Sequence, residues 1–529
     1  MSKQSDFKSH IEEGYTFKGE SLVLGGAMLD GEPVQGLQVK IPLKTLNRHG
    51  LIAGATGTGK TKSLQVMAEQ MSLNGIPTVL MDIKGDLSGL ARPGENNDHI
   101  KWRSEAIGVE YNPMQMLVEL MSISDENGVR LRATVSEFGP TLMSKILSLN
   151  ETQEGILSII FKYCDDENIA LLDLKDLRKT LQYINNEGKE GISEEYGQIS
   201  SSSVSTIMRK VIELEQQGAE KFFGEKSFDV NDFIFTNSKG HGQVSIIRLS
   251  DIQNKPKLFS TFMLGLLAEL YELLPEVGDS DKPKLCLFID EAHLVFKEAT
   301  NELLDQIEVI IKLIRSKGVG VFFCTQLPTD IPDEVLSQLG LKVQHALRAF
   351  TAKDRKTIKK TAENYPLTDY YETDELITQL GIGEALITAL SEKGIPTPLA
   401  ATLMRAPVTR MDILSPQEVT KLVSQSTLAD RYAENIDRES AYEILGGKIR
   451  AAKEEERQEE VRFKREKEKK AYEKSVRKNK PKPRKTTKTP KRKTTSRSKT
   501  RPSSSGSSNS DTLIKELTRG LFSILGMKR

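Results

Sequence analysis

The sequence predicts an α/β fold with a mainly parallel sheet, and three short segments indicate it. Residues 49–53 are mainly apolar and run into a glycine-rich loop, residues 285–289 are apolar and precede two acids, and residues 319–324 precede a polar pair. Continuous apolar runs of this length are typical of strands that are buried on both faces of a parallel sheet. Residues 301–317 place apolar side chains three and four positions apart, which predicts an amphipathic helix between two of these strands.

The loop after the first strand matches the phosphate-binding pattern G-x-x-x-x-G-K-[ST] at every defined position. It consists of Gly54, Ala55, Thr56, Gly57, Thr58, Gly59, Lys60 and Thr61. A helical pattern over 62–72 follows, so the loop has the strand–loop–helix context in which the motif functions. Its backbone N–H groups would hold the phosphates of ATP, Lys60 would reach the β- and γ-phosphates, and the Thr61 hydroxyl would ligate Mg²⁺. A glycine-rich turn with no ligand is the alternative, which this context disfavours.

Two adjacent acids, Asp290 and Glu291, follow the second strand. Ligands of open α/β sheets bind at the carboxyl ends of the strands, so these acids are expected beside the nucleotide. Asp290 would hold Mg²⁺, mainly through the water shell of the ion, and Glu291 would polarise the attacking water. The two acids could instead cap the following helix. Together with the phosphate loop, they favour hydrolysis over the action of a GTP switch or a kinase.

A glutamine, Gln326, ends the third strand and is expected next to the acidic strand. In that position it would sense the γ-phosphate or orient water, although a strand-end glutamine could also bond a loop carbonyl. A strand, a helix and a strand combined with a single phosphate loop predict a RecA-like core.

Longer strings resemble a known family. Residues 314–340, 344–354 and 47–61 are similar to bacterial YjgR-type proteins, which are relatives of the HerA helicase C-terminal domain, and the similarity covers about residues 15–410. The resemblance implies a RecA-fold ATPase of the HerA/FtsK superfamily, whose better-studied relatives are hexameric DNA pumps, and therefore a homo-oligomeric ring. Only some 45 residues precede the phosphate loop, which is too few for the separate N-terminal barrel of HerA. A HerA-type partnership with a nuclease is therefore in doubt, and translocation rests on fold-level analogy.

The resemblance also implies an arginine that acts on the ATP of a neighbouring subunit, because such fingers neutralise charge on the γ-phosphate. The two candidates are Arg348 and Arg355, expected in the strand and the turn that follow Gln326. Arg348 matches the Leu-Arg-Ala-Phe string of the family, whereas Asp354 and Arg355 match a turn found in related pumps. Each arginine could instead be a surface salt-bridge partner.

Other polar residues admit two interpretations. Asp82 ends another apolar run, and with Lys84 and Asp86 it forms a polar turn, where it could support Mg²⁺-bound water or cap the turn. The string from Asp290 to His293 reads Asp-Glu-Ala-His, as in DEAH-box RNA helicases. That class needs two RecA domains and further motifs, which this chain lacks, so we expect His293 to pack beside the nucleotide.

Composition limits the remaining possibilities. Hydrophobic residues make up 37% and charged residues 28% of the 529 residues, which is typical of a soluble protein. The cysteines at 164, 286 and 324 have no metal-binding spacing, and two lie in expected buried strands, so a reducing, cytoplasmic location is expected. No apolar stretch is long enough to predict a transmembrane segment, and the N-terminus has no signal-peptide core.

The changes in pattern along the chain predict six segments. They are a short β-rich N-terminal segment (1–45), the RecA-like ATPase core (46–82 and 244–410), a helical insertion subdomain (83–243), a helical charged extension (411–473), a disordered basic tail (474–510) and an amphipathic C-terminal helix (511–529). The insertion is far too long to be a connecting loop.

The net charge is only +1, but the basic and acidic residues are distributed unevenly along the chain. Residues 1–473 contain 57 basic and 72 acidic residues, whereas residues 474–501 contain fourteen Lys or Arg and no acid. A flexible basic tail suits binding to the phosphate backbone of DNA without sequence readout. Alternatively, the tail keeps the protein in solution or docks on its own acidic body.

Two classes of function remain. The first is a Mg²⁺-dependent ATPase that resembles HerA-like helicases and translocases and acts on or near nucleic acid. The second is a nucleotide-controlled scaffold or signalling ATPase without translocation.

Overall fold

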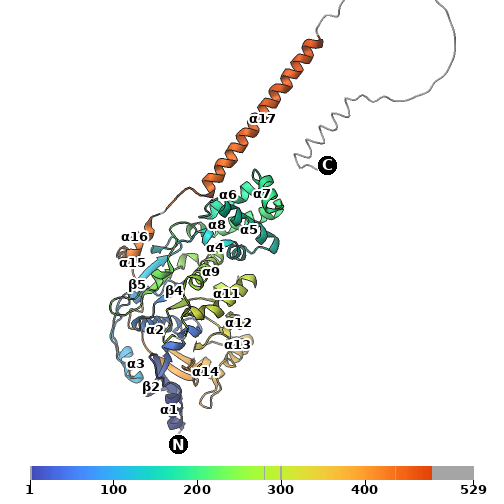
Figure 1. The fold of residues 1–529 in the computed structure, drawn as a ribbon. Helices are drawn as coiled ribbons and strands as arrows, with labels where there is room; N and C mark the ends of the chain where they lie inside the picture. The colour runs from blue at the N-terminus through green and yellow to red at the C-terminus, as the bar shows by residue number, and fades with distance from the viewer. Residues whose placement is uncertain (1–2, 279, 298–300, 435, 479–529) are drawn as a thin grey trace, which may run out of the picture. The chain divides into compact units, whose positions relative to one another are not determined.

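The computed structural model describes residues 3–278, 280–297, 301–434 and 436–478. The chain divides into two compact units, Met1–Glu456 and Arg457–Arg529, and the first contains the sheet (Figure 1). Within the second unit, residues 457–478 are helical. None of the described helices is both long and apolar enough to span a bilayer.

A single mixed sheet organises the first unit. Its order across the described residues is β2-β1-β12-β11-β10-β3-β9-β8-β4-β7-β5-β6. The strands are β1 (Ser21–Leu29), β2 (Glu32–Pro42), β3 (Gly50–Ala53), β4 (Thr78–Asp82), β5 (Val118–Ser122), β6 (Val129–Arg130), β7 (Val244–Arg248), β8 (Leu285–Ile289), β9 (Val319–Thr325), β10 (Leu341–His345), β11 (Glu384–Thr388) and β12 (Ala400–Met404). All pairs from β10 to β6 are parallel, and those from β2 to β10 are antiparallel. The predicted α/β fold with a mainly parallel sheet is confirmed.

The middle of the sheet places the predicted site strands together. Ile52 of β3 pairs with Val343 of β10 on one side and with Cys324 of β9 on the other. On the far side of β9, Phe322 pairs with Phe288 of β8. The strand before the phosphate loop and the strand before the acids are therefore separated by β9 alone.

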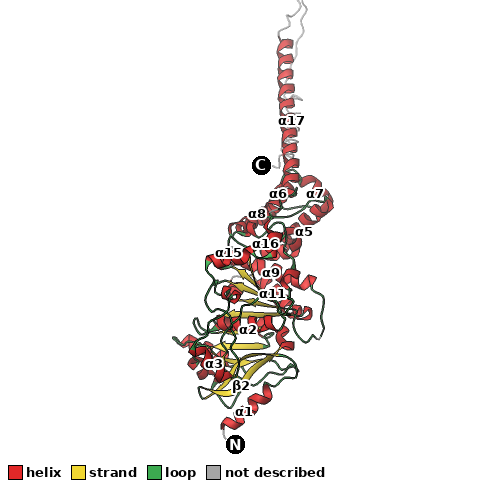
Figure 2. Ribbon diagram, turned by 90° about the vertical axis from the view of Figure 1, so that its left-hand side faces the viewer, coloured by secondary structure: helices red, strands yellow, loops and turns green. Residues whose placement is uncertain are grey.

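Both faces of the sheet are covered, because its strands are apolar on both sides. The helices are α1 (Lys3–Gly14), α2 (Lys60–Leu73), α3 (Asp98–Ile107), α4 (Val135–Ile146), α5 (Glu151–Asp166), α6 (Leu174–Asn185), α7 (Lys189–Tyr196), α8 (Ser201–Gln216), α9 (Pro256–Leu273), α10 (His293–Lys297), α11 (Asn301–Ile314), α12 (Asp333–Leu336), α13 (Ala352–Ala362), α14 (Thr373–Gln379), α15 (Pro416–Ser424), α16 (Thr427–Ala433) and α17 (Ala441–Lys478) (Figure 2). In β4, Val79 and Met81 pack into the core that contains α9 and α11, whereas Leu80 packs into the core that contains α2. This alternation follows from the two-residue period of a strand.

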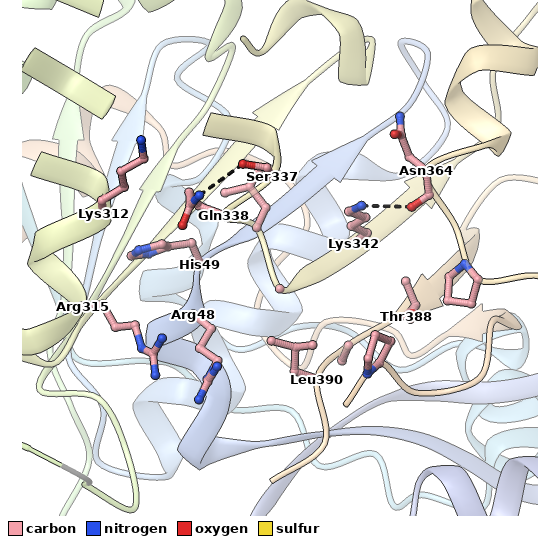
Figure 3. A pocket seen from close by; sticks show the side chains of 15 residues that line it. Arg48, His49, Lys312, Arg315, Ser337, Gln338, Lys342, Asn364, Thr388 and Leu390 are labelled. Atoms are coloured by element: carbon pink, nitrogen blue, oxygen red, sulfur yellow. Dashed lines mark hydrogen bonds between the residues drawn. The ribbon is translucent and has the colours of Figure 1, made fainter. Parts of the chain in front are cut away.

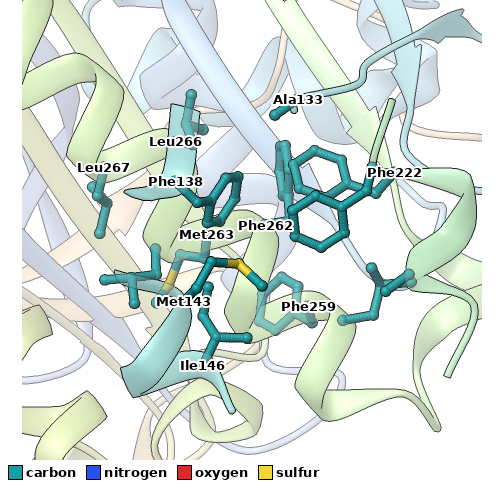
Figure 4. Close-up of a cluster of buried hydrophobic side chains, with 14 of the residues drawn as sticks. Ala133, Phe138, Met143, Ile146, Phe222, Phe259, Phe262, Met263, Leu266 and Leu267 are labelled. Carbon is teal, nitrogen blue, oxygen red and sulfur yellow. The ribbon is translucent and has the colours of Figure 1, made fainter. Parts of the chain in front are cut away.

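The segment between β4 and β7 is mainly helical, and an aromatic cluster fastens it to α9. The Phe222 ring lies 6.0 Å from the Phe138 ring and 5.6 Å from the Phe262 ring of α9 (Figure 4). At Gly265 of α9, a Cβ would lie 2.5 Å from the Phe138 ring, so this position has no room for a side chain. The segment also supplies β5 and β6 to the sheet, and it therefore extends the core as well as covering it.

The first residues of the chain are also part of the sheet. The strands β1 and β2 pair with each other, and β1 pairs with β12. The helix α1, which was not expected, buries Phe7 and Ile11 against them. Just after α1, the Tyr15 hydroxyl lies within hydrogen-bonding distance of the carbonyls of Ile387 (3.0 Å) and Pro398 (2.7 Å).

At the other end, one expectation needs correction. The helix α17 continues to Lys478 and so passes the boundary at 474 where disorder was predicted. Its sequence is rich in Glu, Lys, Arg and Ala, which favour a helix even when exposed. The rest of the predicted tail and the C-terminal helix at 511–529 lie outside the described residues, and the six-segment division stays a prediction.

Candidate nucleotide-binding site

The phosphate loop has a backbone that depends on its glycines. Gly54, Gly57 and Gly59 have φ angles of 154°, 79° and 116°, in the region that L side chains rarely adopt. At Gly59, a Cβ would also lie 3.2 Å from the backbone nitrogen of Gly383. Substitution at Gly59 would therefore strain the backbone and crowd a neighbouring loop.

The loop is anchored on both sides by the strands next to β3. The backbone N–H of Gly54 donates to the carbonyl of Thr325 (3.3 Å), the last residue of β9. The N–H of Ala55 donates to the carbonyl of Ala346 (2.8 Å), which directly follows β10. The crest of the loop, Thr56 and Gly57, is exposed. The sheet thus fixes the base of the loop and leaves its crest open to a ligand.

Lys60 begins α2 and is only 6% exposed. Its ammonium donates to the carbonyls of Gly54 (2.7 Å) and Ala55 (3.2 Å). Burial and the nearby Lys84 lower the pKa of Lys60, while Glu291 and Asp290 oppose this shift. Lys60 therefore lies within electrostatic reach of both predicted acids.

Asp290 directly follows β8 and is 3% exposed. Its Oδ2 atom is buried without a hydrogen-bond partner among the described residues. Burial raises the pKa of Asp290 to about 6, Lys84 opposes the rise, and the charges of Glu291 and Asp86 add to it. A buried carboxylate oxygen that lacks a donor is suited to a hard cation such as Mg²⁺.

The described residues contain no group of three or more His, Cys, Asp or Glu side chains that could enclose a metal ion. Mg²⁺ usually keeps several waters and is held by one or two carboxylates together with substrate phosphates. Asp290 and Thr61, at the first turn of α2, are the residues that fit this ion.

Glu291 has a φ of 45°, which is unusual for a residue with a side chain and costs of order 1 kcal/mol or more. It is 5% exposed. Its Oε1 forms an ion pair with Lys84, and its Oε2 lies 3.1 Å from Nδ1 of His293. Two side chains from different segments thus restrain the acid that was predicted to activate water.

Sequence reasoning missed this role of Lys84. Although burial disfavours its charge, the bond to Glu291 and the charge of Asp290 raise the pKa of Lys84 overall. Asp82 holds the turn that carries Lys84, because its carboxylate accepts from the N–H groups of Gly85 (2.7 Å) and Leu87 (3.1 Å). Asp82 is therefore a turn cap, and the polar turn after β4 was the only sequence signal for Lys84.

His345 is a second residue that sequence reasoning missed. It ends β10, is fully buried, and lies 2.9 Å from the Ser63 hydroxyl and 2.9 Å from the Glu384 carbonyl. Burial lowers its pKa to about 4, so the ring is neutral at pH 7. A Cβ at Gly54 would lie 2.5 Å from that of His345, so Gly54 has no room for a side chain beside the end of β10.

Gln326 is exposed just beyond β9 and lines a cavity of about 670 Å³. His293, which contacts Glu291, lines the same cavity. Asp330 shapes the turn after Gln326, because its carboxylate accepts from Thr325 Oγ1 (2.7 Å) and from the N–H of Leu327 (2.9 Å). The predicted sensor therefore lies on the same side of the site as the predicted base.

The two candidate arginine fingers are both exposed. Arg348 lies after β10, not within it, and donates to the carbonyl of Thr378 (2.9 Å). Arg355 lies in the first turns of α13, so its expected place in a turn was wrong: Thr351 and Asp354 form a capping box that starts a helix there. Among the described residues, Glu291 pairs with Lys84 and not with either of these arginines.

The sequence of this chain is similar to those of known proteins. The family model for the helicase HerA-like C-terminal domain matches residues 28–529. The DNA double-strand break repair helicase HerA of Sulfolobus acidocaldarius is 23% identical over 361 residues, covering 66% of this chain and 64% of that protein. The DNA import protein CedB of the same organism is 24% identical over 363 residues, covering 66% of this chain and 51% of that protein.

The fold has a counterpart among solved structures. The bacterial conjugative coupling protein TrwBdeltaN70 superposes with a TM-score of 0.51 at 14% identity, covering 77% of this chain and 94% of that chain. The chain spans somewhat less than two thirds of the length of the HerA relative. The sheet, the phosphate loop and a family match over nearly the whole sequence lead to one conclusion: this chain belongs to the helicase HerA-like C-terminal family.

Proposed function

We propose that this chain hydrolyses ATP with Mg²⁺ and couples hydrolysis to work on DNA. The proposal rests mainly on one observation. Lys60 and two buried acids, Asp290 and Glu291, lie within electrostatic reach of one another at the carboxyl ends of β3 and β8. The names of the relatives, a repair helicase and a DNA import protein, support DNA as the substrate on which it acts.

The chain would bind the triphosphate through the phosphate loop. The Lys60 ammonium would exchange its bonds to the Gly54 and Ala55 carbonyls for bonds to phosphate oxygens. Such an exchange favours a ligand, because a buried ammonium gains more from an anion than from a neutral carbonyl. Asp290 and Thr61 would hold Mg²⁺, and the ion would supply charge neutralisation of the triphosphate.

Glu291 would accept a proton from the attacking water, with Gln326 orienting that water. The ammonium of Lys84 forms an ion pair with the Glu291 carboxylate, and the His293 ring lies beside it. Arg348 or Arg355 would reach the γ-phosphate of a neighbouring subunit in a homo-oligomeric ring. Because both arginines are exposed on this chain, either can face a partner.

The fourteen basic residues of 474–501 would contact the DNA backbone through counterion release. Such contacts hold DNA of any sequence near the ATPase. These contacts do not determine a direction of movement along DNA.

We expect Mg²⁺-dependent ATP hydrolysis that double-stranded DNA accelerates. Lys60→Ala should weaken nucleotide binding, whereas Glu291→Gln should bind ATP but lose at least about 100-fold in turnover, as is typical of a missing general base. Initial rates with and without DNA, together with nucleotide binding, check both statements. The control is Glu363→Gln at an exposed position, which should match the wild type.

Wild-type turnover by Glu291→Gln would refute the assignment of the base. Hydrolysis that DNA does not change would instead favour a nucleotide-controlled scaffold or signalling ATPase.

We expect the finger to act between subunits. Arg348→Ala or Arg355→Ala should lose turnover alone and regain part of it when mixed with Lys60→Ala subunits, which supply an intact arginine to the neighbouring site. Mixing Lys60→Ala with Glu291→Gln should restore nothing, because both lesions damage the site within one subunit. A monomer whose specific activity does not change with protein concentration would contradict this proposal.

The buried Asp290 carboxylate should make stability depend on pH. Its folded pKa of about 6 lies above the ordinary value of 3.8, so the protonated form favours folding and stability is lost as pH rises through 6. The difference corresponds to about 3 kcal/mol at pH 8. Without Mg²⁺, Asp290→Asn should therefore be more stable than wild type at pH 8 by up to that amount, and equal to it near pH 3.5. Denaturant titrations at several pH values measure this, with Asp98→Asn at an exposed position as control.

A destabilised Asp290→Asn protein at pH 8 would show that the carboxylate is needed for the fold. It would contradict the assignment of its burial to metal binding.

A further inference from the structure

A basic cavity lies at the amino ends of the central strands, whereas the phosphate loop lies at their carboxyl ends. It has a volume of about 600 Å³, and its lining residues include Arg48, Gly340 and Lys342. Arg48 comes just before β3, whereas the phosphate loop comes just after this strand. We call this space the amino-edge cavity, because it lies where the parallel strands β3, β9 and β10 begin.

Positive charge dominates the amino-edge cavity. Arg48, Lys312, Arg315 and Lys342 line it, and the described lining residues include no aspartate or glutamate (Figure 3). Lys312 forms an ion pair with Glu308, one turn earlier on α11. A net excess of cations around a concave space attracts anions.

Lys342 is the most informative of these cations, because it is partly buried. Its ammonium donates to the Asn364 carbonyl (2.9 Å) and lies 5.9 Å from the centre of the Tyr365 ring. Burial lowers the pKa of Lys342, so its charge is held at a cost. A neutral carbonyl and a ring compensate a charge less well than a carboxylate does.

The floor of the amino-edge cavity is rigid. His49 accepts from the N–H of Val321 (3.0 Å) through Nδ1 and donates to the Ile311 carbonyl (2.9 Å) through Nε2. Burial lowers its pKa to about 4, so this ring stays neutral at pH 7. It ties the start of β3 to β9 and α11, and thereby holds the elements that carry Arg48 and Lys312 in place.

The basic surface extends beyond this cavity. A neighbouring cavity of about 540 Å³ shares Arg48, Lys312 and Arg315 with it and adds Lys44 and Lys393. Two acids also line the neighbouring cavity. One of them, Glu392, accepts from the N–H groups of Lys18 (3.1 Å) and Gly19 (2.7 Å).

We propose that the amino-edge cavity binds the phosphate group of a ligand and is a second anion site, separate from the phosphate loop. The Arg48 guanidinium can bind a phosphate through two parallel N–H bonds, and the Lys342 ammonium adds a point charge. The volume suits a ligand of mononucleotide size, and Leu390 and Pro396 offer an apolar wall for its remaining part. The phosphate can belong to a small organic phosphate or to a DNA backbone that passes over the cavity.

The test uses the full chain in the Lys60→Ala background, in which the phosphate loop lacks its ammonium. This choice makes the result independent of ATP hydrolysis, so the proposed function and this inference can fail separately. The cavity variant carries Arg48→Gln and Lys342→Gln. The control carries Lys101→Gln and Lys421→Gln, which remove two exposed charges far from the cavity in sequence.

Pyrophosphate binding is measured by calorimetry, and binding to a short duplex is measured against salt concentration. A small-phosphate site predicts that the cavity variant binds pyrophosphate at least ten-fold more weakly than the control. A DNA-backbone site predicts no pyrophosphate binding, and a salt dependence whose slope is flatter by about 2 than that of the control, from about 0.9 per lost contact.

Equal pyrophosphate binding and equal salt slopes in the two variants would overturn the proposal. If the double variant does not fold, as judged by thermal unfolding, the single variant Arg48→Gln, at a partly exposed position, replaces it. The same comparison with the control then applies, with about half the effect on the slope.

Discussion

Two buried carboxylates and one buried ammonium, together with the more exposed ammonium of Lys84, meet at one edge of the sheet, and the site depends on this constraint. Lys60, Lys84, Asp290 and Glu291 compensate one another only in part, since the pKa of Lys60 is lowered and that of Asp290 is raised. Burying side-chain charges that are only partly compensated costs free energy of folding. A ligand that brings both a cation and an anion offsets this free energy. Mg²⁺ and a triphosphate together are such a ligand.

The sheet holds these charges in place. Because β9 lies between β3 and β8, the phosphate loop and the acids stand one strand apart at the same edge. The loop bonds to the ends of β9 and β10, and the N–H of Ala292 donates to the carbonyl of Cys324 in β9 (2.8 Å). The same strands begin at the amino-edge cavity, so both anion sites are built on one rigid frame.

Features that depend on a short stretch of sequence were predictable. The strands β3, β8 and β9 are continuous apolar runs, and recognisable motifs follow β3 and β8. The mainly parallel sheet and the positions of Lys60 and Asp290 after these strands therefore followed from the sequence, whereas the roles of these two residues stay predictions. Features that join distant segments were not. The pairing of Lys84 with Glu291 spans β4 and β8, and the amino-edge cavity gathers side chains from before β3, from α11 and from β10. Arg355 was misplaced because its short-range capping signal was overlooked.

Coupling between Mg²⁺ and nucleotide at Asp290 tests the central claim most directly. Calorimetric titration of ADP at pH 8, with and without Mg²⁺, should show at least ten-fold tighter binding with the ion in the wild type. In Asp290→Asn this gain should vanish while binding of ADP alone persists, because the phosphate loop and Lys60 remain intact. A full Mg²⁺ gain in Asp290→Asn would contradict the account, since the metal would then be held without the buried carboxylate.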